Sequence, residues 1–209
     1  MLRPTMRRVA SAVLASALLV GGLAVGSGTA AASIGDNNIY RTAENVTVTK
    51  YASHFADGVV NPWYVPAGDV ETIHNRFTVA EGHERLLTRI TDHGPAGFTY
   101  VPGSATIRIG YADNTSQSER ITPEVGPGTV SVAAPGAGWS VPLGGYVIFS
   151  VEYRAPLTAP SGTMSGSGVT FDVAGHEGSL GWNPMGLNFI IGSRPVAPKP
   201  GSSELGFGS

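Results

Sequence analysis

The chain has 209 residues, with 13 Lys+Arg against 15 Asp+Glu and a net charge of −2 when the histidines are neutral. Such a balance gives no basic footprint of the kind that binds nucleic acid, so we expect no nucleic-acid partner. The chain also has no cysteine, which excludes disulfide bonds, thiol chemistry and cysteine-based metal sites.

Residues 1–32 have the pattern of a secretory signal peptide. Arginines without any acidic residue begin the chain, an apolar stretch follows, and the small residues Ala30 and Ala32 place a cleavage before Ser33. The alternative, a membrane anchor, fits less well because glycines interrupt the apolar stretch. We therefore predict a secreted bacterial protein, extracellular or held in the cell envelope, with no integral membrane span after cleavage.

Beyond residue 32, short runs alternate apolar and polar residues, as strands with one buried face do. Ile73, Phe77 and Val79, for example, point to one face of their run. Turns rich in proline and glycine separate the runs, and no long stretch has helical periodicity. We predict an all-β fold, an antiparallel Ig-like β-sandwich over residues 33–193, with strands at 46–51, 71–79, 105–111, 145–154, 168–173 and 187–191. Proline, glycine and serine dominate residues 194–209, which predicts a flexible tail.

Several short motifs follow one another in a distinctive order within residues 65–156. A Gly-Asp turn opens one strand, another strand ends in Thr-Asp before a Pro-Ala-Gly corner with a tyrosine, and a Gly-Ser and a later glycine precede further strands. The positions are Gly68, Asp69, Thr91, Asp92, Pro95, Ala96, Gly97, Tyr100, Gly103, Ser104 and Gly144.

This order resembles the Ig-like "conserved repeat" domain of bacterial secreted and cell-surface proteins. Two departures are visible: Gly94 stands where that family usually has a leucine, and the stretch AEGHER replaces a characteristic Asn-Thr-Gly. The resemblance implies an Ig-like sandwich that serves as a stalk, spacer or adhesive module. It implies no catalytic residues.

Asp92 and His93 are the first candidates for catalysis, because a carboxylate can orient an imidazole for proton transfer. Neighbouring residues on an extended chain point to opposite faces, however, which argues against such a pair. The interpretation that we favour has Asp92 capping the turn by accepting backbone N–H groups, while His93 faces solvent. No G-x-S-x-G motif is present either. We therefore expect no catalytic residues and no enzymatic activity.

Histidines are the possible metal ligands of this chain. None are spaced i, i+2 or i, i+4, and no D-x-[DN]-x-[DN]-G calcium loop occurs. Histidines that are far apart in the sequence could still meet in the folded chain. We expect no metal and no cofactor. The five histidines are His54, His74, His83, His93 and His176.

Large aromatic residues flank several of the Pro/Gly turns, namely Trp63, Tyr64, Trp139 and Trp182. Exposed aromatic rings can stack on sugars, which makes Trp63, Tyr64 and Trp182 the candidate ligand-binding residues. The alternative, which we favour, is that these rings close the ends of the core, because large aromatic side chains dominate core burial.

These patterns favour a secreted, non-catalytic module of the cell envelope or extracellular space, with a structural or interaction role. Its expected partner is an envelope protein or a polysaccharide that the sequence does not identify. One alternative is a glycan-binding β-sandwich. The other is an envelope-associated pore-forming β-protein, which would need longer strands with an apolar lipid-facing side.

Overall fold

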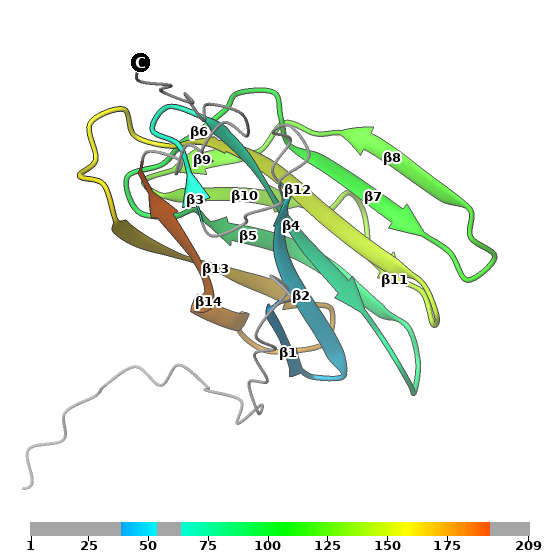
Figure 1. Ribbon diagram of the computed structural model, residues 1–209. Coiled ribbons are helices and arrows are strands. Elements are labelled where there is room, and N and C mark those ends of the chain that lie inside the picture. Colours follow the sequence, from blue (N-terminus) through cyan, green and yellow to red (C-terminus); the bar gives the residue numbers. More distant parts are fainter. Residues whose placement is uncertain (1–38, 54–63, 193–209) are drawn as a thin grey trace, which may run out of the picture.

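The structure is a computed structural model that describes residues 39–53 and 64–192. These residues form fourteen strands in two seven-stranded sheets, which pack face to face (Figure 1). The prediction of an all-β fold with mostly antiparallel strands is confirmed. The predicted signal peptide and the predicted tail lie outside the described residues and stay predictions.

The first sheet, called sheet A here, has the strand order β1-β2-β4-β12-β7-β8, and β6 pairs with β12 as well. All of its strand pairs are antiparallel. The strands are β1 (Ile39–Ala43), β2 (Val46–Ser53), β4 (Val70–Thr78), β6 (Thr99–Tyr100), β7 (Thr106–Gly110), β8 (Ser116–Arg120) and β12 (Tyr146–Arg154).

The second sheet, called sheet B, has the order β3-β14-β13-β5-β10-β9, and β11 also pairs with β5. Of its strand pairs within the described residues, β3–β14 alone is parallel. The strands are β3 (Tyr64–Val65), β5 (Arg85–His93), β9 (Glu124–Gly126), β10 (Thr129–Ala133), β11 (Trp139–Val141), β13 (Thr163–Val173) and β14 (Leu180–Ile191).

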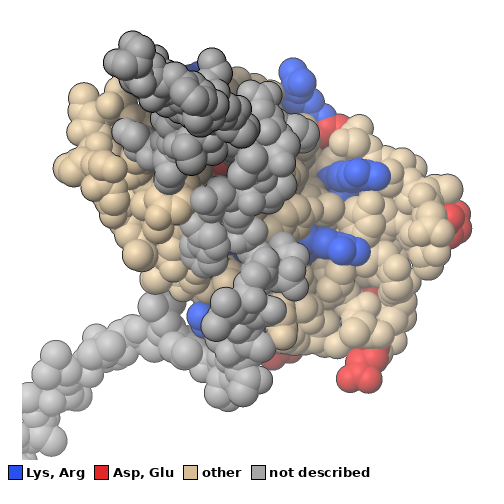
Figure 2. All heavy atoms as spheres, in the orientation of Figure 1, with Lys and Arg blue, Asp and Glu red and all other residues tan. Residues whose placement is uncertain are grey.

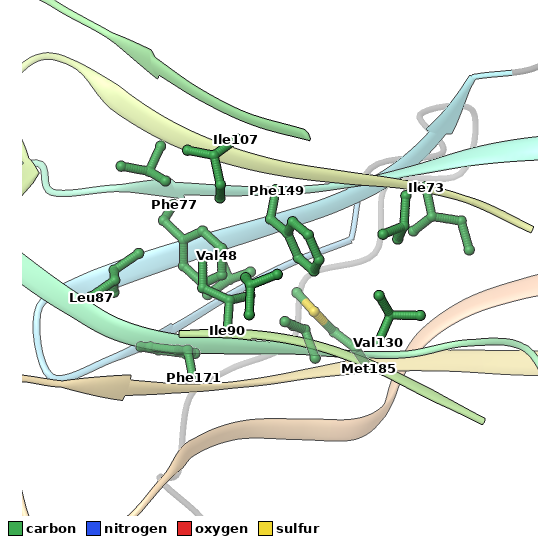
Figure 3. Packing of buried hydrophobic residues seen from close by; sticks show 14 of the residues in the cluster. Val48, Ile73, Phe77, Leu87, Ile90, Ile107, Val130, Phe149, Phe171 and Met185 are labelled. Atoms are coloured by element: carbon green, nitrogen blue, oxygen red, sulfur yellow. The ribbon is translucent and has the colours of Figure 1, made fainter. Parts of the chain in front are cut away.

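The facing sides of the two sheets form a shared hydrophobic core (Figure 3). Alternation places every second residue there: in β12, Val147, Phe149 and Val151 have no exposed surface. Phe77 of sheet A meets Phe171 of sheet B edge to face, with ring centroids 5.3 Å apart and planes at 69°. Contacts of this kind join the sheets and contribute about 0.5–1.5 kcal/mol each beyond area burial.

Within residues 39–53 and 64–192, no helix has the length and hydrophobicity that crossing a membrane requires.

Candidate functional site

Several polar side chains lie inside this hydrophobic core, and three of them, which have no exposed surface, bind one another: Lys50, Asn75 and Asp92. Each occupies a core-facing position of its strand. In β2, every second residue from Val46 to Lys50 is buried, so Lys50 points to the same face as Val46 and Val48. Because burying a charge costs several kcal/mol unless it is paired, a buried lysine requires an explanation in its partners.

The strand register brings the three side chains together. Lys50 of β2 lies directly opposite Asn75 of β4, in an antiparallel pair of sheet A. Side chains opposite one another have Cβ atoms about 4.5–5.5 Å apart, so the amine and the carboxamide share one site. Asp92 comes from β5 of sheet B and reaches across the core. We call these three residues the Lys–Asn–Asp cluster.

Every polar group of the cluster has hydrogen-bond partners. Lys50 Nζ donates to Asn75 Oδ1 at 2.8 Å, to the carbonyl oxygen of Gly168 at 2.9 Å and to Asp92 Oδ2, with which it forms an ion pair. Asn75 Nδ2 donates to the same Asp92 Oδ2 at 2.7 Å. The carboxamide oxygen therefore faces the amine, and its nitrogen faces the carboxylate.

Tyr153 of β12 completes the surroundings of the carboxylate. Its hydroxyl donates to Asp92 Oδ1 at 2.7 Å, and its side chain is almost fully buried. The ring also lines an apolar cavity of about 440 Å³ together with Phe98, Tyr100 and Val130. Tyr153 thus separates this cavity from Asp92.

A backbone irregularity points the Gly168 carbonyl at the ammonium group. The register of β13 against β14 shifts between Ser167 and Val169, which is a β-bulge. A Cβ atom on Gly168 would lie 2.6 Å from the carbonyl oxygen of Trp182 and 2.7 Å from Cα of Asn183. Glycine is therefore required here, because β14 leaves no room for a side chain.

Burial dominates the electrostatics of the cluster. Desolvation lowers the pKa of the Lys50 amine, although the neighbouring Asp92 carboxylate acts in the opposite direction. Burial and then the charge of Asp92 raise the pKa of the Tyr153 hydroxyl far above its ordinary value. Tyr153 therefore stays protonated and donates its hydrogen bond at every physiological pH.

The cluster is capable of two things chemically. It can persist as a buried ion pair with a bridging amide, which is a structural arrangement. It can also react, because a desolvated lysine is more readily deprotonated and its neutral amine is a nucleophile. The carboxamide of Asn75 is an acyl group within hydrogen-bond distance of that amine, and Asp92 contacts both nitrogens as a potential proton carrier.

The sequence-based interpretation of Asp92 as a turn cap is wrong. Asp92 lies within β5, which runs on to His93 before the Gly-Pro turn, and its carboxylate accepts from side chains of the core instead of backbone N–H groups. His93 points to the opposite face, where Nε2 and Thr170 Oγ1 are 3.0 Å apart. His93 is half-buried, so the expectation that it faces solvent freely is also wrong. Asp92 and His93 therefore point to opposite faces of β5, as expected for neighbouring residues of a strand.

Two of the three predicted ligand-binding aromatic residues, Tyr64 of β3 and Trp182 of β14, lie within the described residues. Trp63 lies outside the described residues, and Tyr64 stands on β3 with 36% of its surface exposed. Trp182 is 8% exposed, and the Arg41 guanidinium lies 5.9 Å from its ring centroid. A buried ring offers no platform for a sugar, so Trp182 belongs to the core, as does Trp139 at 5% exposure. The part played by Tyr64 stays a prediction.

The histidines within the described residues do not meet either. His74 is held between Ser53 Oγ and Ser150 Oγ, each 2.8 Å from a ring nitrogen. No group of three or more potential metal ligands occurs among residues 39–53 and 64–192. His54 lies outside the described residues.

Lys50 and Asn75 were not recognised as site residues from the sequence, although a signal existed. Ile73 and Phe77 were placed on the buried face of residues 71–79, and Asn75 lies between them with the same parity. Lys50 follows Val48 by two residues, and Asp92 follows Ile90 by two. A polar residue in the core-facing position of an otherwise alternating strand is thus the pattern that would have located the cluster.

Comparison with known proteins gives matches of architecture. No family model matches the chain, and no curated protein sequence does. A protein from Corynebacterium diphtheriae described as membrane-anchored is similar over 75% of this chain and 38% of its own, with 14% identity and a TM-score of 0.47. The pilus backbone RrgB of Streptococcus pneumoniae is similar over 61% of this chain and 52% of its own, with 15% identity and a TM-score of 0.42.

ACE19, the collagen-binding subdomain of the Enterococcus faecalis surface protein ACE, matches over 62% of this chain and 94% of its own, with 9% identity and a TM-score of 0.32. An enzyme, AvmM, which catalyses macrocyclization in alchivemycin A biosynthesis, is also among the matches. The chain spans between about two fifths and a half of the first two structures. Its fold is similar to Ig-like β-domains of bacterial surface proteins, and this likeness carries no residue role across.

Proposed function

We propose that the chain is a secreted, non-catalytic structural module of the bacterial cell envelope, and that an amide bond between Lys50 and Asn75 cross-links its sandwich. The observation that carries the proposal is the fully buried contact of the Lys50 amine with the Asn75 carboxamide and the Asp92 carboxylate. The bond would form once in each molecule, so the chain is its own substrate and not an enzyme.

The reaction needs only the atoms of the cluster. Asp92 takes one proton from the Lys50 ammonium, and the neutral Nζ forms a bond to Cγ of Asn75. Asp92 passes its proton to Asn75 Nδ2 and takes a second one from Nζ. The Cγ–Nδ2 bond then breaks and Nδ2 leaves as ammonia. The products are an amide with one N–H, one ammonia molecule and a protonated Asp92 carboxyl, and no oxidant, cofactor or water is consumed.

The surroundings favour this reaction over a persistent ion pair. The low dielectric of the core disfavours the ammonium form, as the lowered pKa of Lys50 indicates. The amide product carries no charge, so the reaction removes a buried cation from the core. Full burial also keeps bulk water away from the acyl carbon, which would otherwise compete with the amine.

A cross-link at this position would do what a disulfide does in other exported proteins. The chain has no cysteine, so disulfides are not available to it. Residues 50 and 75 are 25 positions apart, and the bond would close this stretch of chain into a covalent loop. Such a loop restricts the unfolded chain and stabilises the folded one.

Intact mass spectrometry of the purified protein tests the proposal. We expect a mass lower by one ammonia than the sequence requires, and a proteolytic digest that contains a branched peptide joining Lys50 to Asn75. Lys50→Met and Asp92→Asn should each retain the full mass, since one lacks the nucleophile and the other the proton carrier.

The Lys50→Met variant also separates the cross-link from a simpler loss of ammonia. An asparagine can lose ammonia by cyclising on its own backbone, and that change would persist without Lys50. A folded wild-type protein with its full sequence mass would overturn the proposal. An ammonia loss that survives in Lys50→Met would overturn it too.

A further inference from the structure

The outer face of sheet A, which points away from the core, carries a compact group of basic and aromatic side chains. Arg76 of β4 and Arg108 of β7 lie on either side of Ile148 in β12, directly opposite it in both strand pairs. Tyr51 of β2 and Tyr146 of β12 complete the group, which we call the arginine–tyrosine patch.

Both guanidinium groups lean toward the same row of the sheet, formed by Tyr146, Gly110 and Ser116. The Arg76 guanidinium lies 4.7 Å from the centroid of the Tyr146 ring. Arg108 Nη2 donates to Ser116 Oγ at 3.0 Å, and Ser116 is the partner of Gly110 in the β7–β8 pair. Gly110 in turn lies opposite Tyr146. The Arg76 guanidinium thus contacts Tyr146 on β12, whereas that of Arg108 reaches Ser116, two strands away in the same row.

The position of Tyr146 depends on a glycine. A Cβ atom on Gly110 would lie only 2.2 Å from Cζ of the Tyr146 ring, so the ring covers the bare backbone of β7. A side chain at position 110 would expel it. The ring is thus fixed across the sheet, and cation–π contact with Arg76 stabilises it further.

The patch has an excess of positive charge that the described residues do not neutralise. The ion pairs between described residues are Lys50–Asp92, Arg85–Glu44 and Arg89–Glu124, and none involves Arg76 or Arg108. Both arginines are exposed. In Figure 2, blue side chains stand out over this part of the surface, while red ones lie at its margins.

Tyr51 lies within the electric field of both arginines. Burial raises the pKa of its hydroxyl, whereas the charges of Arg76 and Arg108 act in the opposite direction. Its ring stacks on His74, with centroids 4.7 Å apart. Glu152, an acidic residue of this face, is four positions along β12 from Ile148 and lies opposite Thr72.

We propose that the arginine–tyrosine patch binds an anionic polysaccharide. The guanidinium groups of Arg76 and Arg108 would bind its carboxylate, sulfate or phosphate groups, because guanidinium binds such groups with charge-assisted, often bidentate hydrogen bonds. The tyrosines would contact the sugar rings. Thr49, Thr106 and Ser150, on the same face, supply hydroxyl groups for the sugar hydroxyls.

A polysaccharide fits this surface better than a protein partner does. Protein interfaces concentrate their binding energy in aromatic or aliphatic anchors that fill pockets. Two cavities among the described residues lie outside the patch. Tyr153 lines one of them, and Ile107, Ile109 and part of β8 line the other. The patch itself offers charges, hydroxyls and a fixed ring. This inference is independent of the proposed Lys50–Asn75 bond, which lies on the opposite face of the same sheet.

Affinity electrophoresis of the purified protein in gels that contain a soluble polymer tests the inference. The probes are alginate, a polyuronate, and dextran sulfate, with uncharged dextran as the matched polymer control. We expect the two anionic polymers to retard the wild-type protein and dextran to leave its mobility unchanged. Retardation should weaken as salt rises, since salt screens exposed charges.

The variants Arg76→Ala and Arg108→Ala should each weaken binding by about ten- to a hundredfold, as the loss of a charged hydrogen bond does. Arg89→Ala is the matched control, because Arg89 is an arginine of sheet B that pairs with Glu124. Tyr146→Ala should weaken binding without changing net charge. Circular dichroism confirms that each variant is folded.

Several outcomes would overturn the inference. No retardation by either anionic polymer at low salt is one, and equal loss of binding in Arg89→Ala and in the patch variants is another. Polyglutamate and vesicles with anionic lipid serve as competing probes. Binding to either of them as tight as to alginate would show a general affinity for anions and would refute the polysaccharide assignment.

Discussion

Replacing Asn75 by alanine removes the acyl group of the proposed cross-link, so that Lys50 and Asp92 stay an unreacted ion pair. The cross-link would close a loop of 25 residues. In the chain-entropy description of cross-links, a loop of this length contributes about 3.5 kcal/mol at 25 °C. If no cross-link formed, the variant would lose only the hydrogen bonds of the carboxamide, which are worth about 1–3 kcal/mol. With the cross-link present in the wild-type protein, we expect Asn75→Ala to lower the free energy of unfolding by about 3.5 kcal/mol.

Chemical denaturation monitored by circular dichroism measures this loss and distinguishes the two cases. A cross-linked unfolded chain exposes less surface, so removal of the bond should increase the m-value as well as lower the midpoint. Loss of hydrogen bonds alone lowers the midpoint at constant m. In thermal unfolding, the loop contribution corresponds to a fall in Tm of about 7–14 °C for a domain of this size.

Asn188→Ala is the matched control for this experiment. Asn188 is a partly buried asparagine of β14 whose Nδ2 donates to the Gly186 carbonyl at 3.1 Å. Its replacement should cost about 1 kcal/mol and leave the m-value unchanged. If Asn75→Ala behaves like Asn188→Ala, with a small shift of midpoint and a constant m, the loop argument is refuted.

Three further outcomes are expected. Tyr153→Phe leaves Asp92 Oδ1 without its donor at 2.7 Å, which should cost about 1–3 kcal/mol in denaturation and slow the ammonia loss in a mass time course after refolding. Gly168→Ala places a Cβ atom 2.6 Å from a backbone oxygen of β14, so it should cost about 1–3 kcal/mol and reduce the cross-linked fraction. Burial lowers the pKa of His74 below its ordinary value of 6.5, so the unfolded state binds the proton first. Stability should therefore fall as pH drops below 6.5 toward the folded pKa, and fall less in His74→Gln. Unchanged stability, an unchanged cross-linked fraction or an identical pH profile, respectively, would contradict these expectations.

The strands with one buried face were predictable because alternation reports burial directly. The run at 145–154 became β12, which spans Tyr146–Arg154, and the run at 71–79 became β4. β8 escaped prediction for a physical reason: it is an edge strand whose five residues are all exposed, so neither face selects apolar side chains. Its sequence, SQSER, has no periodicity to detect.

The Lys–Asn–Asp cluster could be predicted only in part from the sequence. The core-facing position of each residue could be deduced from its strand, but the register that sets Lys50 opposite Asn75 depends on how β2 and β4 pair. The approach of Asp92 depends on which sheet β5 joins, and that is decided by packing over the whole chain. A Gly-Pro sequence two residues later made a turn cap the simpler interpretation.

The two proposals meet in the backbone of β2 and β4. Lys50 is followed directly by Tyr51, and Asn75 by Arg76. Because consecutive residues of a strand point to opposite faces, the proposed cross-link beneath sheet A would pin the same two strands that present part of the patch above it. A polymer bound at Tyr51 or Arg76 would exert tension on β2 and β4. The amide bond would oppose the separation of these two strands. Hydrogen bonds between β2 and β4 could open under such a load, whereas a covalent bond between their side chains would keep them in register.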